Sequence, residues 1–266
     1  MIEKFGKGAD AGIFGDRTES EEFNRDILIP WQQLRPKEMD FVGVYPVEEI
    51  MKDLDDVKKK KNNPEFVKGK TEESMVSEYA LPYLIEDEQI WGDADVSVSM
   101  TSEFDDIMRG TDFVIRYNID GQDFYMGIDV KTNMAGSHDY RVEKSISQIV
   151  EAAKKGRLNT IKYFKDLQED GDGRKKSLEI PVAVIVFKNN KILPLRDILP
   201  IHPKKRSESQ KRQLEEIKTK LNQELKDNCR EMIQLVQALI TSSSDKPKEK
   251  IIGSYKNFLR FLDSLE

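Results

Sequence analysis

Residues 110–132, GTDFVIRYNIDGQDFYMGIDVKT, predict the central element of the fold. Two runs of alternating apolar and polar residues flank Asp120-Gly121, a dipeptide typical of tight hairpin turns. Alternation with a period of two gives each run one apolar face and one polar face. We therefore expect two antiparallel strands joined by a two-residue turn.

The register of this hairpin decides which polar side chains meet. With a two-residue turn Ile119 pairs with Gln122, and Asp112 then lies directly opposite Asp129. A slip by one residue would place apolar side chains opposite polar ones, which burial of one face forbids. The sequence thus predicts that Asp112 and Asp129 are neighbours on the polar face.

Two carboxylates in this arrangement repel each other and destabilise the strand pair. A divalent cation reverses the sign of that interaction, because hard cations prefer oxygen ligands. Lys131 follows Asp129 by two residues and shares its face. The hairpin is expected to present two metal ligands and one cation; the alternative is a solvated sheet face whose charges simply pair.

Asp112, followed by Asp129-Val130-Lys131 on the next strand, resembles the motif of the PD-(D/E)xK nuclease superfamily. The family often has Pro before its first Asp, and here that position is Thr111. The resemblance covers residues 71–200 and implies an α/β fold, with a restriction-endonuclease-like αβββαβ core and a mixed sheet. Periodicity alone predicts the same order: a helix from about residue 71, three strands, a helix, and a buried strand at 181–187.

Three regions are expected. Residues 1–70 form an N-terminal arm or subdomain, 71–203 the nuclease-like core, and 204–266 a C-terminal helical extension. Within them, residues 27–31 are interpreted as a short edge strand, 102–109 as a polar connection, and a second helical segment is expected to run to about residue 167. The C-terminal helices are expected to pack on the core, with self-association as the alternative.

A glutamate of the first core helix completes the predicted site. Glu72 keeps helical phase with Met75 and Val76, so it is expected to project toward the sheet. Glu78 is expected to point the other way, and Glu73 is the alternative because helix starts are uncertain by a residue or two.

The resemblance implies a nuclease that hydrolyses phosphodiester bonds of nucleic acid, with DNA favoured, and uses Mg²⁺ or Mn²⁺. Asp112, Asp129 and Glu72 would hold the ion, which would lower the pKa of a bound water. Lys131 would orient that water or stabilise charge on the phosphate. His138, in the loop expected after the hairpin, is a candidate ligand or substrate contact; the alternative is a loop histidine without a role.

Composition sets limits on these expectations. The chain has 266 residues and a net charge of −6, which does not by itself favour nucleic-acid binding, although local basic runs such as residues 58–61 matter more than the total. The single cysteine, Cys229, excludes an intramolecular disulfide and a zinc cluster. Without a membrane-spanning apolar run or a signal peptide, we expect a cytoplasmic protein with no membrane partner. Two alternatives stay open: a catalytically idle nuclease-fold module that binds nucleic acid or assembles, and a mainly helical interaction protein.

Overall fold

A four-stranded mixed sheet forms the centre of the computed structural model, which describes residues 21–64, 66, 72–133, 140–164, 177–188, 194–239 and 246–265. The strand order is β1-β2-β3-β6, with bounds β1 (Val96–Met100), β2 (Phe113–Ile119), β3 (Gln122–Asn133) and β6 (Val182–Lys188). β1, β2 and β3 are antiparallel neighbours, and β6 runs parallel to β3. The predicted α/β class and mixed sheet are confirmed.

The hairpin of β2 and β3 has the predicted register. Ile119 pairs with Gln122 and Phe113 pairs with Ile128. Asp120 and Gly121 have φ values of 53° and 81°, as a two-residue hairpin turn requires. The apolar alternation therefore determined the pairing, because a slip would expose the face that packs against the core.

The outer edge of β6 is closed by side chains of the two C-terminal helices, α10 (Glu208–Ala238) and α11 (Lys246–Asp263). The Val184 N–H donates to Asn228 Oδ1 at 3.2 Å, and the Tyr255 hydroxyl donates to the Val182 carbonyl at 2.8 Å. These bonds satisfy backbone groups that an edge strand would otherwise leave open.

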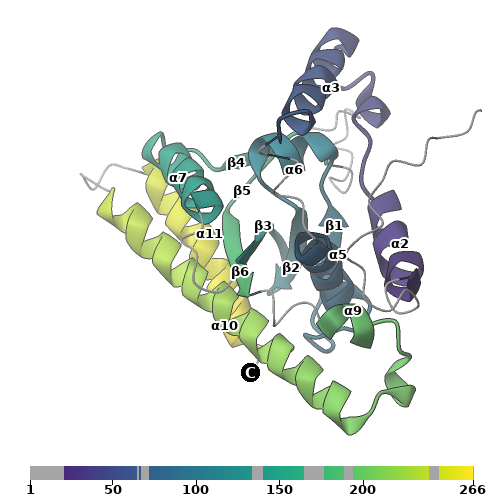
Figure 1. Ribbon diagram of the computed structural model, residues 1–266. Helices are drawn as coiled ribbons and strands as arrows, with labels where there is room; N and C mark the ends of the chain where they lie inside the picture. The colour runs from purple at the N-terminus through teal and green to yellow at the C-terminus, as the bar shows by residue number, and fades with distance from the viewer. Residues whose placement is uncertain are drawn as a thin grey trace, which may run out of the picture.

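Helices lie on both sides of the sheet in the view of Figure 1, with α7 (Tyr140–Lys154), α10 and α11 on one side and α2 (Ile29–Gln33) and α5 (Glu72–Glu86) on the other. The apolar residues of α10 are buried in the main core: Leu214, Ile217, Leu221, Leu225, Cys229, Met232 and Val236. This face is thus used for packing within the chain, and self-association through these helices stays a prediction.

The segment expected as an edge strand is helical instead. Residues 24–33 form η1 (Asn24–Leu28) and α2, followed by η2 (Glu38–Phe41) and α3 (Val47–Lys61). Phe23, Ile27 and Trp31 recur every four residues and are all buried in the main core. That spacing places them on one helical face, and it outweighs the local preference of Ile27–Trp31 for an extended chain.

The expected polar connection at 102–109 contains a helix, α6 (Glu103–Arg109). The Ser102 hydroxyl accepts the Asp105 N–H at 3.1 Å, and Gly110 ends the helix with a φ of 67°. α6 packs with α3 and Tyr163 in a second, smaller core.

The remaining elements lie near the ends of the sheet. β4 (Asn159–Ile161) and β5 (Leu178–Ile180) form a separate two-stranded sheet, so the helix expected up to residue 167 is wrong where β4 lies. α9 (Pro194–Ile198) and η3 (Pro203–Lys205) lead into α10.

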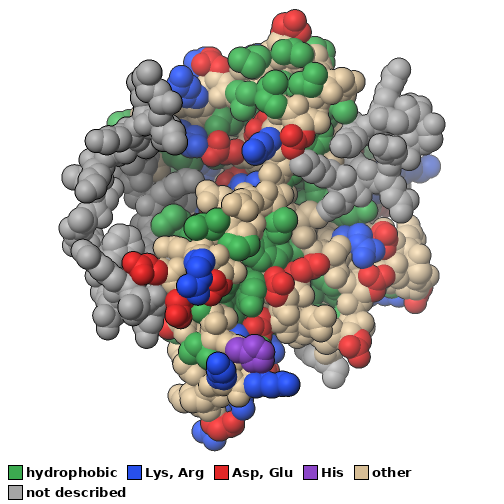
Figure 2. All heavy atoms as spheres, turned by 90° about the vertical axis from the view of Figure 1, so that its right-hand side faces the viewer, with side chains coloured by type: hydrophobic (Ala, Val, Ile, Leu, Met, Phe, Trp, Pro, Cys, Tyr) green, Lys and Arg blue, Asp and Glu red, His purple; other side chains and the backbone are tan. Residues whose placement is uncertain are grey.

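The surface shown in Figure 2 has apolar side chains gathered at its top, with acidic and basic side chains intermixed below them. Exposed apolar residues of η2 and α3 and of the turn between them include Met39, Val42, Val47 and Met51. Among the described helices, none is both long and apolar enough to cross a bilayer.

Candidate functional site

Asp112 directly precedes β2, at the end of the β2–β3 hairpin that lies away from the turn. Its backbone N–H donates to the Ile128 carbonyl at 2.8 Å, and its side-chain Oδ2 accepts the Val130 N–H at 2.6 Å. In the ladder Ile128 pairs with Phe113, so the bond from Asp112 to Ile128 is shifted by one residue, and regular pairing ends at Phe113 and Ile128. Asp112 therefore lies near its predicted position, but its carboxylate accepts a backbone N–H of the neighbouring strand, β3. Asp112 and Asp129 do not form the predicted ladder pair.

Asp129 and Lys131 lie on the face of β3 opposite to Ile128 and Val130, as strand alternation requires. The Lys131 ammonium donates to Asp129 Oδ1, and Asp129 is 1 % exposed. Burial acts to lower the pKa of Lys131, but Asp129 and Asp112 outweigh it and raise the pKa above its ordinary value. The predicted proximity of Asp112, Asp129 and Lys131 is thus present in the structure.

Glu78 also belongs to this group, which contradicts the expectation that it points away. Carboxylate oxygens of Glu78, Asp106 and Asp112 lie within 4.8 Å of one another. α5 contacts β1 and β3 as well as η1 and α2, and it continues through Pro82. Since the helix is buried on several sides, its apolar phase did not identify the side that faces the acids.

Glu72 is the first residue of α5, but its side chain and that of Glu73 lie outside the described part of the chain, as does His138. At a rise of about 1.5 Å per residue, Glu72 begins roughly 9 Å before Glu78 along the helix axis. Its predicted role stays a prediction.

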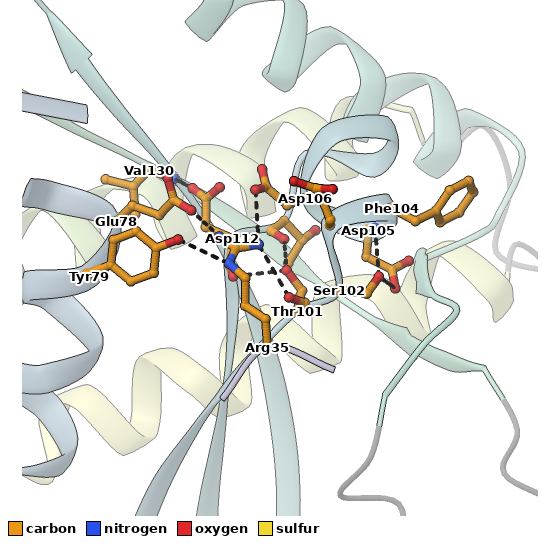
Figure 3. A network of polar contacts seen from close by, with 12 residues as sticks. Arg35, Glu78, Tyr79, Thr101, Ser102, Phe104, Asp105, Asp106, Asp112 and Val130 are labelled. Atoms are coloured by element: carbon orange, nitrogen blue, oxygen red, sulfur yellow. Dashed lines mark hydrogen bonds and ion pairs between the residues drawn. The ribbon is translucent and has the colours of Figure 1, made fainter. Parts of the chain in front are cut away.

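Two further members, Asp106 and Arg35, were not singled out from the sequence. Asp106 extends from α6, and Arg35 follows α2. Figure 3 shows the Arg35 side chain pointing between Glu78 and Asp106; it binds Glu78 Oε1 through Nη2 and Asp106 Oδ2 through Nη1, the latter at 3.0 Å. A Ser at 102 and a Gly at 110 are start and stop signals that could have revealed α6. No local signal marks Arg35.

The electrostatics of the cluster centre on Asp112. Burial raises the pKa of Asp112 well above its ordinary value, and Asp106, Asp129 and Glu78 add to the rise while Lys131 opposes it. Glu78, Asp106, Asp112 and Asp129 outnumber their cationic partners Arg35 and Lys131 by two. Carboxylate oxygens are the donors that Mg²⁺ and Mn²⁺ prefer, and Glu78, Asp106 and Asp112 lie close enough together to share one ion.

A second group of cations lies beside the acids. The Lys60 ammonium, at the end of α3, donates to the Ile107 carbonyl of α6. Burial lowers the pKa of Lys60, and Lys144 and Lys131 lower it further, while Asp106 opposes them. Lys144 of α7 and Lys131 of β3 therefore both lie close enough to Lys60 of α3 to disfavour its charge, and an anion nearby would relieve that repulsion.

Comparison of the chain with protein-family models, with curated proteins and with solved structures found no match.

Proposed function

We propose that this chain is a metal-dependent nuclease that hydrolyses phosphodiester bonds of nucleic acid, with DNA as the favoured substrate. The observation that supports it is the convergence of Glu78, Asp106, Asp112 and Asp129, which come from four different parts of the chain, beside Lys131. The element order around the mixed sheet is compatible with a restriction-endonuclease-like core, which is part of the proposal. An intracellular location, where nucleic acid is found, is part of it as well.

The charge balance favours a divalent cation in this cluster. Carboxylates that are buried together cost free energy when ionised, because each disfavours the charge of the next. The raised pKa of Asp112 reflects that cost. A bound Mg²⁺ or Mn²⁺ would remove that cost by favouring the ionised form of Asp112, and it would supply a water of lowered pKa at the phosphate.

Each residue has a role in this scheme. Asp112 would hold the ion together with Glu78 and Asp106, whose oxygens lie within 4.8 Å of its own, and Asp129 would be a further ligand. Lys131 keeps its proton, because neighbouring carboxylates raise its pKa. A protonated Lys131 would stabilise negative charge that develops on the phosphate. Lys60 and Lys144 would attract the anionic backbone of the substrate.

Cleavage assays on defined substrates test the proposal. Supercoiled DNA, linear DNA and single-stranded RNA are incubated with the full chain and Mg²⁺ or Mn²⁺, and products are separated by electrophoresis. Asp129→Asn and Lys131→Ala should each reduce cleavage by a factor of about 10²–10³. Asp123→Asn, on the same strand but 43 % exposed and bound to Arg116, is the matched control and should cleave normally. Absence of ion-dependent cleavage on every substrate would refute the proposal.

The pairing of Arg35 with Glu78 and Asp106 favours a second candidate, a catalytically idle module that keeps the fold and binds nucleic acid. In that molecule the guanidinium would permanently take the place of the ion. Binding of labelled DNA, weakened by added salt and by Lys60→Ala but never followed by cleavage, would distinguish it.

A further inference from the structure

Arg35 is held at the acidic cluster by several groups at once. Besides Glu78 and Asp106, its guanidinium donates to the Tyr79 hydroxyl at 3.3 Å and to the Thr101 carbonyl at 3.4 Å. Its side chain is 12 % exposed. Each of its three nitrogens has a partner, so the guanidinium is bound in a specific site.

The backbone on either side of Arg35 is anchored separately. Trp31, four residues earlier, is buried in the main core. Glu38, three residues later, accepts the Phe104 N–H at 2.8 Å at the start of α6. The segment therefore stays in place when the Arg35 side chain releases its partners, and only side-chain torsions need to change.

The same carboxylates cannot serve the guanidinium and a divalent ion together. Two of the three acids whose oxygens lie within 4.8 Å of one another are the partners of Arg35. An ion such as Mg²⁺ binds oxygen at about 2.0–2.1 Å and demands near-ideal geometry. Oxygens that point at the guanidinium would have to turn toward the ion, and the cation already present would repel it.

We propose that Arg35 is a resident counter-cation that competes with the divalent ion for Glu78 and Asp106 and thereby sets the ion affinity of the site. The inference rests on the proposed function, because it needs an ion site in this cluster. In the absence of ion Arg35 neutralises two acids and stabilises the fold; when the ion binds, Arg35 releases them. The segment that contains Arg35 would thus control how tightly the acidic cluster binds the ion.

Ion binding to the full chain, without substrate, tests the competition. Calorimetry measures the Mn²⁺ affinity of wild type, Arg35→Gln and Arg35→Lys. The melting temperature of each protein is then recorded in EDTA and in Mn²⁺. Arg35→Gln should bind Mn²⁺ about tenfold more tightly, within the usual range of coupling between two sites. Its melting temperature should fall in EDTA and rise further than that of wild type when Mn²⁺ is added. Arg35→Lys keeps the charge but cannot contact all four partners, so its Mn²⁺ affinity should lie between those of wild type and Arg35→Gln.

Arg116 provides the matched control, because it also bridges two aspartates, Asp95 and Asp123, at 2.9 Å each, but away from the cluster. Arg116→Gln should leave Mn²⁺ affinity unchanged. Equal or weaker Mn²⁺ binding by Arg35→Gln, with wild type binding normally, would overturn the competition and leave the proposed ion site standing. If Arg35→Gln does not fold, Arg35→Lys decides: a loss of Mn²⁺ affinity in it would overturn the proposal. No Mn²⁺ binding by any variant would overturn both the competition and the ion site.

Discussion

Asp105 and Glu103 are acids of the same helix, α6, and the structure predicts a large loss of stability when Asp105 loses its charge and little change when Glu103 does. Asp105 is fully buried, and its two oxygens accept three bonds. Oδ1 accepts the Lys162 N–H at 2.8 Å, and Oδ2 accepts the Tyr163 N–H and the Ser102 hydroxyl, both at 2.9 Å. The carboxylate thus joins α6 to the segment that follows β4.

Asp105→Asn replaces one of these acceptors with an amide that can only donate. Whichever oxygen is lost, one backbone N–H then faces another donor inside the protein. Losing a bond to a charged acceptor costs about 1.5–3 kcal/mol, and a buried unsatisfied N–H costs about 1–3 kcal/mol. We therefore expect the free energy of unfolding to fall by about 3–5 kcal/mol.

Urea denaturation followed by far-ultraviolet circular dichroism measures this loss. With a denaturant slope of about 3 kcal/mol/M, the midpoint should fall by about 1–1.7 M. Glu103→Gln is the control, since the Glu103 side chain is 44 % exposed and its ion pair with Lys61 lies at the surface; it should change the free energy of unfolding by less than about 1 kcal/mol. A shift of under 1 kcal/mol for Asp105→Asn would refute the assignment of Asp105 as the acceptor that holds these segments.

Two further predictions concern the sheet. Burial raises the pKa of Asp112 in the folded chain, and Asp106, Asp129 and Glu78 raise it further while Lys131 opposes them. The folded state therefore keeps a proton that the unfolded chain releases at a pH of about 4. As pH rises from about 4 to that raised pKa, the ionisation of Asp112 should lower the free energy of unfolding. In melting curves recorded in EDTA, Asp112→Asn should lack this decrease; an unchanged pH dependence would contradict the raised pKa of Asp112. A Cβ at Gly127 would lie 2.9 Å from Val182 Cγ2 and 3.0 Å from Thr111 Cγ2, so Gly127→Ala should destabilise the protein by about 1–3 kcal/mol in the same urea assay. Gly253→Ala is the control: a Cβ there, inside α11, meets no atom within 4 Å, so this change should not destabilise the protein.

Much of the sheet could be predicted from the sequence because strand pairing depends on local patterns. The alternation around Asp120-Gly121 determined the register, and the nearly continuous apolar run at 181–187 indicated a strand buried on both faces. Since side chains alternate strictly along a strand, the placement of Asp129 beside Lys131 followed directly from their spacing. Predictions failed where a short helix was mistaken for a connection, at α6, and where helical spacing was overlooked, at residues 24–33.

The sequence by itself determined that Asp129 and Lys131 share one face of β3 and that Asp112 lies near them. Only the tertiary structure decided that Glu78, Asp106 and Arg35 join them. α5 is buried against the sheet on one side and against η1 and α2 on another, so hydrophobic periodicity does not show which side carries the functional glutamate. Arg35 reaches Glu78 across 43 residues and Asp106 across 71, and such contacts depend on how whole elements pack. Local patterns determine the direction of a side chain within its own element, whereas the partners it meets are determined by the packing of the core.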